Sequence, residues 1–100
     1  MQAWYPAGFD REYGCTEAEW LGWLPAAIGE PSWHSPAPGC AEVELASGRL
    51  ALSWTPLPLR RIALVALPRL AVAFRFGSVD EAERQAFMKR FDLYMQRGGG

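Results

Sequence analysis

The sequence predicts an α+β fold: an antiparallel sheet of about four strands in meander order, with an N-terminal and a C-terminal helix packed on it. Three observations lead to this prediction. Residues 60–76 form a long apolar segment rich in strand-forming residues. Residues 41–54 alternate apolar and polar side chains around Ser47-Gly48. Helix-start patterns lie before and after these segments, at Thr16 and at Ser78.

The apolar segment 60–76 is better interpreted as two strands than as one helix. Its four arginines exclude a membrane span, which needs about 20 predominantly apolar residues. Pro68 would break a buried helix in its middle. We therefore expect two strands joined by a turn at Pro68-Arg69. The expected cross-strand pairs are Leu67 with Leu70, Val65 with Val72, and Ala63 with Phe74.

This pairing places bulky side chains on one face and small apolar ones on the other, around Ala71, Ala73 and Arg75. An antiparallel sheet usually has one polar face in contact with water. Neither face is fully polar here. We therefore expect that helices cover both faces or that the alanine-rich face contacts another chain.

Length and composition indicate a single folded domain over residues 1–100. Half of the residues are hydrophobic and 21% are charged, which excludes a disordered chain. The net charge of −1 offers no field that would attract nucleic acid or an anionic membrane. Lys89 is the single lysine among ten basic residues and asparagine is absent, which suggests a GC-rich bacterial genome.

The N-terminal segment, residues 1–14, has no signal-peptide pattern, and we expect a cytoplasmic protein. Its aromatic residues indicate an arm that docks on the domain, since exposure of several large side chains is costly. A second interpretation is an arm that binds a partner. Cys15 and Cys40 lie far apart in sequence, and in a reducing cytosol both are expected to be free thiols.

The first helix is expected to begin at Thr16, because Thr16 and Glu19 have the spacing of a capping box. Pro25 predicts a kink or an end near Leu24. A second capping box, Ser78 with Glu81, predicts the start of the C-terminal helix. This helix carries an aromatic and methionine stripe, which we interpret as core, and ends at about residue 97 before a flexible tail at 98–100.

The segment between the helices contains a hairpin with a two-residue loop at Ser47-Gly48. With this loop, the large apolar residues of both strands fall on one face and Glu42 and Glu44 fall on the other. The expected pairs are Leu45 with Leu50, Val43 with Leu52, and Ala41 with Trp54.

The sequence shows little chemistry. His34 is the only histidine, no general base is placed beside either cysteine, and the ligand spacings of a zinc site are missing. We therefore expect no catalytic residue, no metal and no cofactor. The order helix, strands, helix resembles the layout of double-stranded RNA-binding domains. Those domains carry a basic cluster where this chain has Asp80, Glu81 and Glu83, which argues against RNA binding.

Two hypotheses of function follow. The first is a small protein-binding or accessory module, expected to be a homodimer or to bind another protein. The candidate contact residues of this module are Trp33 and His34, on the proline-rich loop, and Ala71, Ala73 and Arg75, on the alanine-rich face. The second hypothesis is a small-ligand-binding or enzymatic domain with a pocket between sheet and helices. The residues expected to line this pocket are Trp20, Trp23, Trp54 and Phe74.

Overall fold

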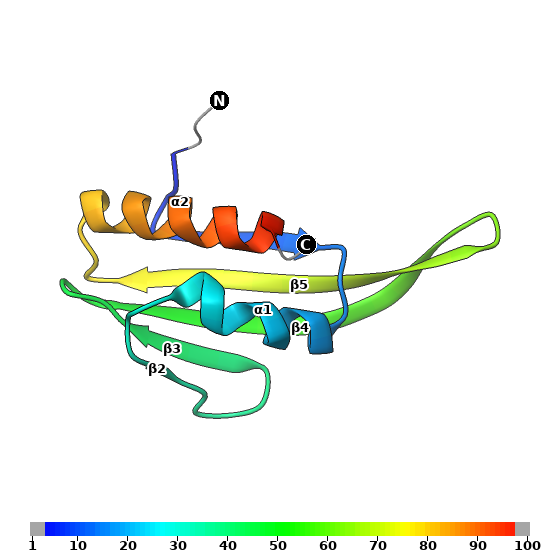
Figure 1. The fold of residues 1–100 in the computed structure, drawn as a ribbon, viewed down its shortest axis with the longest axis horizontal. Helices are drawn as coiled ribbons and strands as arrows, with labels where there is room; N and C mark the ends of the chain where they lie inside the picture. Colours follow the sequence, from blue (N-terminus) through cyan, green and yellow to red (C-terminus); the bar gives the residue numbers. More distant parts are fainter. Residues whose placement is uncertain (1–3, 98–100) are drawn as a thin grey trace.

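The structure is a computed structural model that describes residues 4–97, so the tail predicted at 98–100 lies outside the described residues. The elements are β1 (Gly8–Tyr13), α1 (Glu17–Ile28), β2 (Trp33–His34), β3 (Cys40–Glu44), β4 (Arg49–Ile62), β5 (Val65–Gly77) and α2 (Glu81–Arg97). The five strands form one antiparallel sheet in the order β1-β5-β4-β3-β2, as Figure 1 shows. The predicted α+β fold is confirmed. Strands β2 to β5 form the meander, and β1 adds a further strand beside β5.

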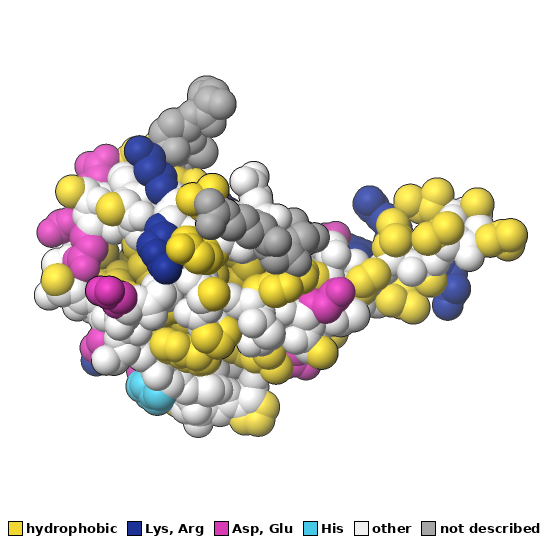
Figure 2. Space-filling view, in the orientation of Figure 1, with side chains coloured by type: hydrophobic (Ala, Val, Ile, Leu, Met, Phe, Trp, Pro, Cys, Tyr) yellow, Lys and Arg dark blue, Asp and Glu magenta, His cyan; other side chains and the backbone are white. Residues whose placement is uncertain are grey.

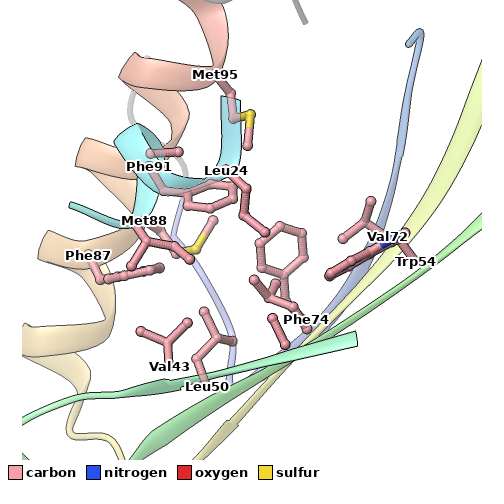
Figure 3. Close-up of a cluster of buried hydrophobic side chains, with 14 of the residues drawn as sticks. Leu24, Val43, Leu50, Trp54, Val72, Phe74, Phe87, Met88, Phe91 and Met95 are labelled. Atoms are coloured by element: carbon pink, nitrogen blue, oxygen red, sulfur yellow. The ribbon is translucent and has the colours of Figure 1, made fainter. Parts of the chain in front are cut away.

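Both helices pack on one face of the sheet, and the core lies between them and the strands. Strand side chains from β3, β4 and β5 point toward side chains from α1 and α2 (Figure 3). The most deeply buried large side chains are Trp20, Leu24, Ile28, Val43, Leu50, Leu52, Leu70, Val72, Phe74, Met88 and Phe91. The aromatic stripe predicted on the last helix is part of this core.

The N-terminal segment docks on the core, and its residues 8–13 form an edge strand of the sheet. β1 pairs with β5 over its whole length, from Gly8 opposite Arg75 to Tyr13 opposite Leu70. Phe9 stacks on Phe74 with ring centroids 4.7 Å apart. Tyr5, Phe9 and Tyr13 therefore complete the core face of the sheet, whereas Trp4 is 61% exposed.

The turn between the two long strands lies at Ala63-Leu64, and the prediction of a turn at Pro68-Arg69 is wrong. Ile62 pairs with Val65 next to the turn, and Ala63 adopts a left-handed φ of 53°. Pro68 lies inside β5, beyond the last residue pair of β1. Its missing N–H therefore removes no ladder hydrogen bond on that side, which is where strands tolerate proline.

The corrected turn changes the register of the central pair. Trp54 lies opposite Val72 and Leu52 opposite Phe74, so two bulky rows meet under the helices. The strand predicted at 60–67 is therefore the end of β4, the turn and the start of β5. Residues 55–59, which precede this segment, also belong to β4.

The hairpin at Ser47-Gly48 is present, but its loop covers residues 45–48 and its register differs by two residues from the prediction. Val43 pairs with Leu50, not with Leu52. A shift by two keeps every side chain on its predicted face. Gly48 approaches the backbone so closely that an added Cβ would lie 2.1 Å from the Gly77 carbonyl oxygen. Glycine is therefore required there.

The starts of the two helices differ in how well the sequence predicts them. The capping box of Thr16 and Glu19 is present at α1. Pro25 lies inside α1 without ending it: its residue is exposed, and the helix continues to Ile28. At α2 the cap is Asp80, whose carboxylate accepts the Glu83 amide at 2.8 Å. Ser78, the predicted cap, adopts a φ of 62° outside the helix.

Among residues 4–97, no helix has both the length and the apolar composition needed to cross a bilayer.

Candidate functional site: a projecting hairpin and an open sheet face

The distal half of the β4–β5 hairpin projects beyond the rest of the domain, and we call residues 57–69 the arm. β1 ends opposite Leu70 and β3 begins opposite Ser53. Past these points β4 and β5 pair only with each other in the described chain. Figure 1 shows the arm leaving the body as a two-stranded ribbon that curves away from the sheet. This extension accounts for the elongated shape, 47 × 35 × 21 Å.

The arm exposes large apolar side chains. Their exposed fractions are Leu59 52%, Ile62 55%, Leu64 103%, Val65 53% and Leu67 41%. The arm in Figure 2 is almost entirely hydrophobic, with patches of basic side chains and no acidic one. Scattered exposed leucines are ordinary, but a contiguous apolar surface raised above the domain is typical of an interaction site.

Prolines on both strands protect the edges of the arm against strand addition. Pro58 lies on β4 and Pro68 on β5, and Pro56 lies on β4 directly before the arm. Proline cannot donate a backbone hydrogen bond, and edge prolines prevent uncontrolled pairing of exposed strands. A register irregularity between Leu57 and Arg60 further interrupts the β4 edge. The arm is therefore suited to contacts through its side chains rather than through its backbone.

The pairing of the arm assigns its side chains to two faces. Arg60 lies opposite Leu67, and Ile62 lies opposite Val65. Since paired residues share a face, these four form one face of the ribbon. Arg61 and Ala66 form the other face. The apolar side chains Ile62, Val65 and Leu67 thus lie side by side next to a guanidinium group.

The same alternation runs along β5 from the arm into the body. Val65 and Leu67 share their side of the strand with Ala71, Ala73 and Arg75, since successive side chains alternate. This is the side of the sheet that neither helix covers. Of the two alternatives expected for this face, cover by helices is wrong, because α1 and α2 share the other face.

This uncovered side, the open face, has small side chains at its centre. They are Ala51, Ser53, Thr55, Ala71 and Ala73, contributed by the two central strands. A shallow hollow of about 330 Å³ lies over four of them, Ser53, Thr55, Ala71 and Ala73, and is bordered by Asp10 and Arg75. The alanine-rich face predicted from the sequence is therefore present and reaches solvent.

Ion pairs border this centre on both sides. Arg75 lies 2.9 Å from Asp10, Arg69 lies 2.9 Å from Glu12, and Arg49 lies 3.3 Å from Glu44. The hydrogen bonds from Arg69 lower the pKa of Glu12 below its usual range. The open face therefore combines a flat centre with a charged border.

A second hollow, of about 690 Å³, lies at the end of the open face away from the arm. It is lined by the β3–β4 loop, by Ala51 and by residues 75–78. The loop is held in place by Glu83, which accepts the backbone amides of Ala46 at 2.7 Å and Ser47 at 2.9 Å. This end of the face is therefore preformed.

Trp33 and His34 lie on the short edge strand β2, not on a loop as predicted. They point to opposite sides of the sheet: Trp33 packs against the core, whereas His34 lies on the open side. The His34 Nε2 atom is 3.7 Å from a Glu42 carboxylate oxygen. The structure therefore does not bring Trp33 and His34 together as one patch, and strands β3 and β4 separate His34 from Ala73.

The tryptophans expected to line a pocket fill the core instead. Trp20 is fully buried, Trp54 is 6% exposed, and their ring centroids lie 5.6 Å apart. Phe74 is also fully buried, and Trp23 packs at the border of the core. These contacts occupy the region between sheet and helices in which a ligand pocket was expected.

Among the polar groups near the helices, those of Tyr5, Arg11 and Asp92 are paired, whereas the buried Trp20 Nε1 has no hydrogen-bond partner within residues 4–97. Arg11 forms an ion pair with Asp92, which also accepts the Tyr5 hydroxyl at 2.6 Å. Burial and this hydrogen bond raise the pKa of Tyr5. Both cysteines are free thiols, as expected, and Cys15 is buried. Within residues 4–97, no three His, Cys, Asp or Glu side chains gather in a way that could hold a metal.

No protein-family model matches the chain, and no curated protein is detectably similar to it in sequence. The arm and the open face are therefore the features from which a function must be argued. Sequence reasoning identified the open face through its alanines but missed the arm. The sequence did carry a signal for the arm: Pro56, Pro58 and Pro68 and the Arg60-Arg61 pair interrupt an apolar stretch. A buried strand does not accommodate such residues.

Proposed function

We propose that this chain is a protein-binding module that engages its partner through the side chains of the arm. The observation that carries the proposal is the exposure of Leu59, Ile62, Leu64, Val65 and Leu67 on a ribbon that contributes nothing to the core. Natural sequences keep a raised apolar surface of this kind where another molecule covers it.

The energetics support a protein partner. Burial of the exposed part of each of these side chains is worth roughly 1 kcal/mol, or about 5 kcal/mol for the arm. Association costs an estimated 4–15 kcal/mol in lost translational and rotational freedom. One arm alone is therefore marginal, and a stable complex requires either a second arm or further contacts on the body.

The charge of the arm complements an acidic partner surface. Its three basic residues, Arg60, Arg61 and Arg69, stand among apolar residues, and of the three Arg69 forms an ion pair with Glu12 of β1. Arginine is enriched in the energetically important parts of protein interfaces. The same charges keep the free arm from adhering to other basic surfaces.

Site-specific photo-crosslinking in cells that express the chain tests this proposal. A photoreactive amino acid at Leu64, the tip of the arm, should give discrete crosslinked protein bands. The matched control is the same group at Leu93, an exposed leucine on α2 away from the arm. Equal yields at both positions, or no product at Leu64, would contradict binding through the arm.

A further inference from the structure

We infer that the partner of the arm is a second copy of this chain, and that each arm lies across the open face of the other copy. This inference rests on the proposed function, because it names the occupant of the same surface. Three observations lead to it. The arm and the open face lie on the same side of the sheet, their side chains differ in size in a complementary way, and their charges are opposite.

The two surfaces lie on the same side of continuous strands. Ile62, Val65 and Leu67 of the arm share their side with Ala71 and Ala73 of the open face. We place the two copies with their open faces toward each other, related by a two-fold axis that lies between the two sheets, runs across the strands and passes near Arg69. This axis turns one copy over and reverses the direction of its strands. Each arm then extends over the body of the other copy, so the interface is isologous and closed.

The lengths agree with this arrangement. The arm extends six residues along β4, from Leu57 to Ile62, or roughly 20 Å. The body part of β4, eight residues from Arg49 to Pro56, is roughly 27 Å long. An arm of one copy therefore fits within the open face of the other.

The same axis sets the register of contacts. Residues at equal distances from Arg69 along β5 meet, so Val65 lies over Ala73 of the second copy and Leu67 lies over Ala71. Large side chains of the arm thus meet the small side chains of the open face, where the 330 Å³ hollow receives them. The arm tip at Leu64 reaches the level at which the larger hollow begins.

The charges favour the arm-to-body contact over a body-to-body contact. The whole chain carries −1 and the three arginines of the arm carry +3, so the remaining residues together carry −4. On the open face of the body, the acids Asp10, Glu12, Glu42 and Glu44 outnumber the arginines Arg49 and Arg75, with which Glu44 and Asp10 are paired. At the axis, each Arg69 is already paired with Glu12 of its own chain. An arm therefore moves toward an oppositely charged body, whereas two bodies repel each other.

Analytical ultracentrifugation of the full chain tests the inference. We expect a mass of twice 11.1 kDa at tens of micromolar. Val65→Arg on the arm and Ala73→Arg on the open face should each weaken the dimer about tenfold or more. Ala66→Arg, on the other face of the same arm, is the matched control and should leave the dimer intact. Circular dichroism confirms that each variant is folded.

A crosslinking experiment tests the arrangement of the two copies. Val65 and Ala73 are eight residues apart on one strand, roughly 26 Å, so a short bis-maleimide cannot join them within one chain. We expect no crosslinked dimer from Val65→Cys alone or Ala73→Cys alone, each in a Cys40→Ser background. A one-to-one mixture of the two should give a crosslinked dimer.

Each outcome is decisive. A wild-type chain that stays monomeric at tens of micromolar overturns the inference, and so does a dimer that crosslinks through Val65→Cys alone, since the arms would then pair with each other. Loss of dimerisation in Ala66→Arg but not in Val65→Arg would do the same. If the inference fails in one of these ways, crosslinks from Leu64 to a protein of another mass would still support the proposed function. The absence of such crosslinks would contradict the proposed function together with the inference.

Discussion

At the residue scale, one carboxylate links the β3–β4 loop to the last helix. Glu83, in the first turn of α2, accepts the backbone amides of Ala46 and Ser47 and also the Ser47 hydroxyl. The same hydroxyl accepts the Asp80 amide at 2.9 Å. The β3–β4 loop is thereby fixed to the start of the last helix. This network shapes the larger hollow on the open face.

The pKa of Glu83 makes this link dependent on pH. Hydrogen bonds from Ser47 lower the pKa below its usual value of 4.5. The folded state therefore binds the proton less tightly than the unfolded state. The stabilisation is complete above about pH 4.5 and is lost as the pH falls through the lower pKa of the folded state.

Substitution of Glu83 by glutamine tests this link. Glu83→Gln removes the charge but keeps the shape, so the variant should be less stable than wild type at pH 7. The difference in the free energy of unfolding should shrink as the pH falls from 4.5 to 3. Urea denaturation of both proteins at several pH values measures it. A difference that is constant with pH would show that the carboxylate does not stabilise the loop.

At the element scale, the arm is separable from the fold. None of residues 57–69 belongs to the buried core. The core instead depends on the body halves of β4 and β5, which alternate buried and exposed side chains under the helices. The domain therefore carries the arm without depending on it.

A truncated variant should demonstrate this independence. Replacement of residues 58–68 by Asn-Gly joins Leu57 to Arg69, which already lie opposite each other, through a turn suited to hairpins. We expect a change of about 1 kcal/mol or less in the free energy of unfolding, because only surface is removed. Thermal unfolding at submicromolar concentration, followed by circular dichroism, measures the change. Loss of cooperative unfolding would instead make the arm part of the folding unit.

The elements also differ in how well the sequence predicts them. The Thr16 cap and the face pattern of the first hairpin were predictable, because contacts within a few residues decide them. The turn at Ala63-Leu64 was not, because neither residue is a typical turn former whereas Pro68-Arg69 lies nearby. Its position is set by distant partners: the bulky rows of both strands must meet under the helices.

The two parts of the candidate site also differ in how well the sequence predicts them. Ala71, Ala73 and Arg75 were predicted as a contact surface because strand alternation alone puts them on one side. The arm was missed because its leucines and valine have the composition of a buried strand. Only the points at which β1 and β3 end in the structure reveal that this part of the ribbon has no flanking strand on either side.

At the scale of the whole molecule, the residues that stabilise the fold and the residues proposed to bind a partner lie on different parts of the sheet. One face of the sheet carries both helices and the core, and the other face continues without interruption into the arm. The separation explains why a small domain can expose apolar residues and still fold: the exposed set and the buried set lie on different parts of the same two strands. It also makes association and stability thermodynamically coupled if two copies cover these surfaces.

This coupling yields the last prediction. A dimer that forms only from folded chains raises the melting temperature with protein concentration by mass action. For two chains of 100 residues, the expected rise is about 3–5 °C per tenfold increase above the dissociation constant. Differential scanning calorimetry of the wild type from a few to several hundred micromolar measures this slope.

Two arm variants make the measurement specific. Val65→Arg should flatten the concentration dependence, because it places a charge against the alanines of the second copy. Ala66→Arg adds the same charge on the opposite face of the arm and should retain the slope. A wild-type melting temperature that does not change with concentration would show that the arm and the open face are not buried against each other. The retained slope of Ala66→Arg excludes a general effect of net charge, since both variants carry the same one.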